Sequence, residues 1–118
     1  MLPESSYVYE EYAKSYGKLG QTSLAFNYVD RAENTGFQTP SSDILFKVTR
    51  AEILIYDGDI QSALPLAMEA AEYSRAHGHY RRLERIYGIK HFLNQQALKY
   101  NKAVGELSNV LDGPIEPQ

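Results

Sequence analysis

Apolar residues recur at three- and four-residue intervals along most of this chain, which is the spacing of one face of an α-helix. Almost no stretch alternates apolar and polar residues as a half-buried strand would. Glycines follow the helical stretches, at positions where a helix C-terminus favours a residue that tolerates positive φ. They are Gly20, Gly36, Gly58, Gly78 and Gly113. The pattern predicts an all-α protein of five to six helices.

One of these segments is apolar on most of its sides. It reads "DILFKVTRAEILIYD", and at about 100° per residue Ile44, Val48, Ala51 and Ile55 form one stripe. Further apolar side chains lie on other sides of the same helix. Since a helix that is apolar on most sides is buried on most sides, we expect the central helix of a stack or part of an oligomer interface.

Polar residues and a proline mark where two of the helices should begin. Pro40 disfavours helical backbone at Thr39, so Ser41 or Ser42 is expected to cap the apolar helix. Asp59 follows the turn at "DGD" and is expected to cap the next helix in the same way.

The chain contains an internal repeat of small residues. Each member of the second set lies 38 positions after its counterpart in the first. The two sets are Ala13, Gly20, Ala25 and Ala32, and then Ala51, Gly58, Ala63 and Ala70. A glycine at this place allows a tight turn between two antiparallel helices, and alanines allow those helices to cross closely.

This spacing resembles the tetratricopeptide repeat, a helix–turn–helix unit with a small residue on its first helix, a glycine at the turn and two alanines seven apart on its second helix. The matching stretches are "AKSYGKLGQTSLAFNYVDRA" and "AEILIYDGDIQSALPLAMEA", and the resemblance covers roughly residues 5 to 78. The chain departs from the family in lacking a tryptophan near the start and a proline closing the second helix, and its period exceeds 34 residues. The resemblance implies a right-handed superhelix of antiparallel helix pairs.

We expect one domain over residues 1–118. Residues 5–38 would form the first repeat and residues 41–78 the second. The offset fails when it is applied again, so residues 79–112 are either a diverged repeat or a capping helix pair, which a solenoid needs to cover its last apolar face. Residues 113–118 would be a polar tail.

Composition narrows the class of protein. The chain has no cysteine, so thiolate metal sites, disulfides and cysteine nucleophiles are excluded. No run of eighteen apolar residues and no signal-peptide pattern occurs, so we expect a cytoplasmic protein without a membrane segment. Phosphate-binding loops, nucleophile elbows, paired-histidine zinc helices and calcium loops are missing too. The prediction is a protein that is not an enzyme and needs no cofactor or metal.

Histidines offer the alternative of a metal-dependent or enzymatic module. His77 and His79 flank Gly78 and could chelate a metal together. His91 lies twelve residues beyond His79, or roughly 18 Å along one helix, so a single helix cannot bring it to the pair. A helix C-terminus favours positive side chains, and this explains Arg75 and His77 more simply.

Basic residues gather between positions 74 and 91 of a chain whose formal net charge is −3. The arginines of this basic corner are Arg75, Arg81, Arg82 and Arg85. They could form the solvated face of an amphipathic helix, dock onto an acidic peptide or domain, or bind nucleic acid. The last is disfavoured, because a nucleic-acid footprint usually accompanies a basic domain.

In tetratricopeptide stacks the first helix of each pair lines a concave groove that holds a peptide or helix. By that register the groove residues here are Tyr7, Glu10, Lys14, Lys18, Leu45, Val48, Glu52 and Tyr56. Lys14 and Lys18 lie one turn apart and could hold a carboxylate, or they are ordinary surface lysines.

The expected function is therefore a non-catalytic module that binds a protein or peptide. The repeats also resemble the C-terminal helical region of bacterial helix-turn-helix transcriptional regulators. That resemblance implies peptide sensing and a homodimer.

Overall fold

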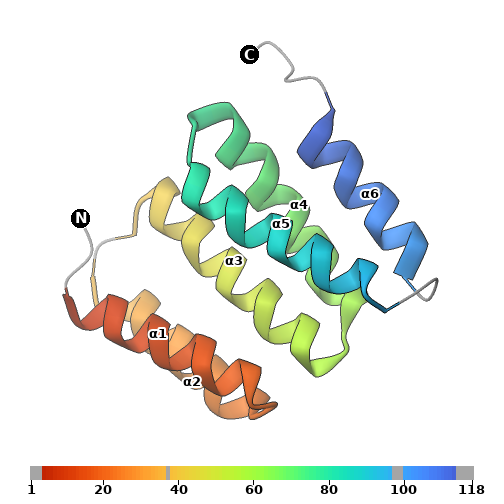
Figure 1. Ribbon diagram of the computed structural model, residues 1–118. Coiled ribbons are helices and arrows are strands. Elements are labelled where there is room, and N and C mark those ends of the chain that lie inside the picture. Colours follow the sequence, from red (N-terminus) through yellow and green to blue (C-terminus); the bar gives the residue numbers. More distant parts are fainter. Residues whose placement is uncertain (1–3, 37, 97–99, 114–118) are drawn as a thin grey trace.

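The computed structural model describes residues 4–36, 38–96 and 100–113 (Figure 1). These residues form six α-helices and contain no strand, so the predicted all-α class is confirmed. The helices are α1 (Glu4–Lys18), α2 (Thr22–Asn34), α3 (Pro40–Asp57), α4 (Ile60–His77), α5 (Tyr80–Asn94) and α6 (Asn101–Asp112). Apart from Gly113, the predicted polar tail lies outside the described residues.

Three tight turns join the helices as the glycine pattern predicts. Gly20, Gly58 and Gly78 have φ of 76°, 85° and 69°, in the left-handed region that glycine adopts without a steric penalty. Gly113 differs, because its φ of −74° lies outside the left-handed region.

Two helices begin at side-chain caps. Asp59 caps α4 as predicted, accepting a hydrogen bond from the Ser62 amide at 3.2 Å. The predicted cap of α3 is wrong by two or three residues: Thr39 is the N-cap and Pro40 is the first helical residue. Proline fits there because its missing N–H would have had no partner in the first turn. Ser42 completes a capping box with Thr39.

The helices follow one another along the chain as three antiparallel pairs, α1–α2, α3–α4 and α5–α6, within a slab of 37 × 36 × 18 Å (Figure 1). The last helix, α6, contacts α4 as well as α5. In Figure 1, α1, α3 and α5 lie toward the viewer, with α2 and α4 behind them. α3 contacts α1 and α5 on either side, which makes one continuous layer of the three first helices. Within the described residues, α2 and α4 do not approach each other closely, so the two layers are not equivalent.

α3 is the central helix that its all-round apolar pattern predicts. Its stripe of Ile44, Val48, Ala51 and Ile55 belongs to a core shared with α4, α5 and α6. Phe46 and Ile53 point the other way, into a core shared with α1 and α2. One helix therefore joins the two halves of the hydrophobic interior.

The repeated alanines lie where helices cross. All six, Ala13, Ala25, Ala32, Ala51, Ala63 and Ala70, are completely buried. Gly17 marks another close approach, since a Cβ there would lie 3.0 Å from Cγ1 of Ile53 on α3. Small side chains let the neighbouring helices come this near, as the repeat predicts.

Candidate functional site

A groove of about 290 Å³ runs across the first helix of each pair. We call it the central groove. Its lining residues come from α1 (Lys14, Lys18), α3 (Glu52, Ile53, Ile55, Tyr56) and α5 (Arg85, Gly88, Ile89, Phe92). Four predicted groove residues, Lys14, Lys18, Glu52 and Tyr56, are therefore brought together here.

The other four predicted groove residues lie elsewhere. Val48 is completely buried in the core, and Glu10 is 4% exposed. Leu45 is partly buried against the α1–α2–α3 core, and Tyr7 is half exposed outside the groove. The repeat register assigned these residues to the correct helices, but neither Glu10 nor Val48 offers a side chain to a ligand.

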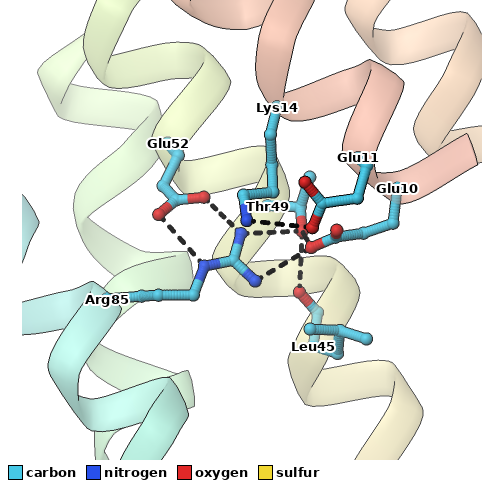
Figure 2. A network of polar contacts seen from close by, with 7 residues as sticks. All are labelled: Glu10, Glu11, Lys14, Leu45, Thr49, Glu52 and Arg85. Atoms are coloured by element: carbon cyan, nitrogen blue, oxygen red, sulfur yellow. Dashed lines mark hydrogen bonds and ion pairs between the residues drawn. The ribbon is translucent and has the colours of Figure 1, made fainter. Parts of the chain in front are cut away.

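A cluster of charged and polar side chains, shown in Figure 2, lies partly in the groove and partly next to it. We call Glu10, Thr49, Glu52 and Arg85 the charge cluster. Arg85 Nη1 donates to Glu10 Oε1 at 2.9 Å, and Arg85 Nε donates to Glu52 Oε2 at 3.2 Å. Its Nη2 pairs with the second oxygen of Glu52 and lies 3.3 Å from Thr49 Oγ1. The cluster thus ties α1, α3 and α5 together.

Thr49 completes the cluster from α3. Its hydroxyl lies 3.0 Å from Glu10 Oε1, so the buried carboxylate has two partners. Burial by itself lowers the pKa of Arg85, but the hydrogen bonds and charges of Glu52 and Glu10 outweigh it and raise that pKa. Arg85 therefore stays cationic and pairs with both carboxylates.

The groove differs in chemistry between its ends. Lys14 pairs with Glu11 at 3.2 Å, whereas Lys18 is exposed and has no hydrogen-bond or ion-pair partner in the described part of the chain. On the opposite side the rings of Tyr56 and Phe92 pack with their centroids 5.5 Å apart. Gly88 lies in the interior of α5, and a Cβ there would meet no neighbouring atom within 4 Å. The groove is thus cationic at α1, apolar at α5 and open above Gly88.

The α5 contribution was missed at the level of sequence. Arg85, Gly88, Ile89 and Phe92 lie three, four and seven positions apart, which is one face of a helix. That spacing indicates that the four residues share one side of α5. The repeat offset fails in this third of the chain, however, so nothing in the sequence aligned α5 with α1 and α3.

The basic corner does not form one surface. Arg75 Nη1 donates to the Val110 carbonyl at 2.7 Å, which attaches α4 to α6. Arg82 Nη1 contacts Ser41 Oγ at 2.8 Å, while Arg85 is part of the charge cluster. Arg81 is exposed and has no such partner in the ranges described. Three of the four arginines thus hold helices together.

His77 and His79 lie close together, with ring centroids 6.1 Å apart, whereas His91 is not part of this pair. His77 stacks on Tyr73 with ring centroids 4.0 Å apart, and His79 Nδ1 lies 2.6 Å from Arg82 Nη1. Burial lowers the pKa of His79, and the charges of Arg82 and His77 lower it further. His91 lies near the far end of α5, beside Gln95. Among the described residues no group of three or more potential metal ligands occurs.

Within the described ranges, no helix is long and apolar enough to cross a membrane. Comparison with known proteins gives no match to a protein-family model, to a curated protein or to a solved structure. The central groove therefore has to be interpreted from its own chemistry.

Proposed function

We propose that the chain is a non-catalytic peptide-binding module with a tetratricopeptide-like, right-handed superhelical stack. The observation that carries this proposal is the central groove, which is formed by the first helix of every pair. The groove lies on the continuous α1–α3–α5 layer, so one face of the stack offers a surface that crosses three helices. This is where a helical-repeat stack binds an extended segment.

The chemistry of the groove defines the peptide that it would take. Lys18, with Lys14 one turn away, would attract a carboxylate of the peptide. Tyr56, Ile89 and Phe92 would pack against a large apolar side chain. The proposed ligand is thus a short peptide with an acidic group or C-terminus at one end and an apolar residue a few positions away.

The same residues support binding rather than catalysis. Glu52 and Arg85 line the groove, are each 20% exposed, and hydrogen-bond to each other. A general acid or base would need to be free to exchange a proton with a substrate. The resemblance of the repeats to the C-terminal helical region of bacterial helix-turn-helix regulators would add a peptide-sensing role, with the bound peptide as the signal.

A charge reversal at the cationic end tests the proposal. Peptides of eight residues would be selected from a random display library on the wild-type protein, and their affinities measured by fluorescence anisotropy. Lys18→Glu should weaken binding at least tenfold, because it places a carboxylate where the peptide's own carboxylate would lie.

Arg81→Glu provides the matched control. It makes the same change of charge at an exposed position on α5 that does not line the groove. Equal losses for the two variants, or no loss for Lys18→Glu, would contradict binding in the central groove.

A further inference from the structure

A second and larger groove, of about 750 Å³, lies between α4 and α6. We call it the α4–α6 groove. Its lining is mainly apolar, with Ile60, Leu64, Pro65 and Met68 from α4 and Ala103 from α6. It shares no residue with the central groove, which lies on α1, α3 and α5.

The packing of α6 explains why the groove opens where it does. The C-terminal end of α6 is held by the bond from Arg75 to the Val110 carbonyl and by bonds from Tyr87 and Lys90 to Asp112. The groove lies along the N-terminal parts of both helices, from residue 60 to 72 of α4 and from residue 100 to 106. One end of the α4–α6 interface is thus closed, and the other exposes apolar side chains.

The polar residues of the groove are mostly acidic. Glu69, Glu72 and Glu106 line it, against Lys102 as its one basic lining residue in the described part of the chain. Lys47 pairs with Glu69, so Glu72 and Glu106 are the carboxylates that can face a partner. These two carboxylates give the groove a negative rim.

A backbone carbonyl adds a hydrogen-bond acceptor to the acidic rim of the α4–α6 groove. Pro65 has no N–H, so the Gln61 carbonyl lacks the amide donor that an α-helix normally supplies four residues later. Gln61 and Pro65 both line the groove. A cationic or amide side chain of a partner would find a hydrogen-bond acceptor there.

We infer that the α4–α6 groove binds an amphipathic helix with basic flanks. Such a helix inserts apolar anchors at positions i, i+3 or i+4, and i+7 into a groove. The stretch from Ile60 to Glu72 spans about 18 Å at 1.5 Å per residue, which matches the roughly 10 Å between the first and last anchors with room for flanking charges. Lysine or arginine beside the anchors would face Glu72 and Glu106.

The test uses two synthetic 14-residue helical peptides with the same leucine anchors, one flanked by lysines and the other by glutamates. Each is titrated into the ¹⁵N-labelled full chain. The lysine peptide should shift the amide signals of Leu64, Met68 and Ala103 and bind at least tenfold more tightly than the glutamate peptide. Glu72→Lys combined with Glu106→Lys should reverse this preference.

The control pair, Glu4→Lys with Glu84→Lys, makes the same change of net charge at exposed positions outside both grooves. The control should keep the wild-type preference. Three results would overturn the inference: no shifts at the three named amides, shifts confined to the central groove, or a preference that the Glu72 and Glu106 changes leave unaltered.

Discussion

Gly88 on α5 and Gly105 on α6 both lie inside a helix with open space where a Cβ would stand. Glycine in a helix interior costs about 0.5–1 kcal/mol relative to alanine. Gly88→Ala and Gly105→Ala should therefore each raise the free energy of unfolding by about that amount, measured by urea denaturation. Gly17→Ala should give no such gain, because its Cβ would lie 3.0 Å from Ile53 Cγ1. A loss at Gly88 would mean that the space above it is closed.

His79 gives a pH dependence whose sign follows from its surroundings. Its pKa is lowered by burial and by the nearby charges of Arg82 and His77. The unfolded chain thus binds the proton more readily, and stability is lost as pH falls through about 6.5 toward the lower folded-state pKa. We expect a small loss of stability between pH 7 and pH 5 that His79→Asn reduces. Urea denaturation at several pH values measures it, and parallel curves for the two proteins would contradict it.

Arg85 acts at the scale of the elements, because it joins three helices through the charge cluster. Its removal leaves Glu10 and Glu52 without their cation in a site where Glu10 is almost completely buried. Arg85→Met should cost about 2–4 kcal/mol, below the roughly 3–5 kcal/mol of a fully buried pair, since Arg85 is 20% exposed. Chemical denaturation measures the cost.

A matched variant separates charge from packing. Arg85→Met combined with Glu10→Gln and Glu52→Gln removes all three charges while keeping similar volumes. It should recover much of the lost stability, because no unpaired charge then stays buried. If the triple variant is less stable than Arg85→Met alone, the cost does not come from unpaired charge.

The helices themselves could be predicted from the sequence. Close helix crossings require small residues, and left-handed turns favour glycine. Both requirements recur wherever two helices pair, and they explain the buried alanines of the repeat and the positive φ of Gly20, Gly58 and Gly78. The cap of α3 differs from the prediction because proline is favoured in the first turn of a helix, so the helix begins at Pro40 and the non-helical Thr39 is its cap.

The residues of the central groove and of the charge cluster could be predicted only in part, for a physical reason. Arg85 and Glu10 are 75 residues apart, and their contact depends on how three helix pairs stack. The register of one helix sets which residues share a face, but not the rotation of that face toward its neighbours. Glu10 therefore entered the list of groove residues, while Gly88, Ile89 and Phe92 did not.

At the scale of the whole molecule, α3 contributes to both hydrophobic cores and to the central groove. The two grooves lie on different sets of helices, α1, α3 and α5 for one and α4 and α6 for the other. The two proposed ligands would therefore contact different sets of helices. We expect the two peptides to bind together, with less than a threefold change in either affinity when the other is present, measured by anisotropy.

Filling the space above Gly88 tests the central claim most directly. Gly88→Leu places an apolar side chain inside the central groove, and leucine is a better helix former than glycine. Gly105→Leu makes the same change outside both grooves. We predict that Gly88→Leu weakens binding of the selected octapeptides at least tenfold without lowering the melting temperature, and that Gly105→Leu leaves binding unchanged. Undiminished binding to a folded Gly88→Leu protein would contradict a peptide site in the central groove.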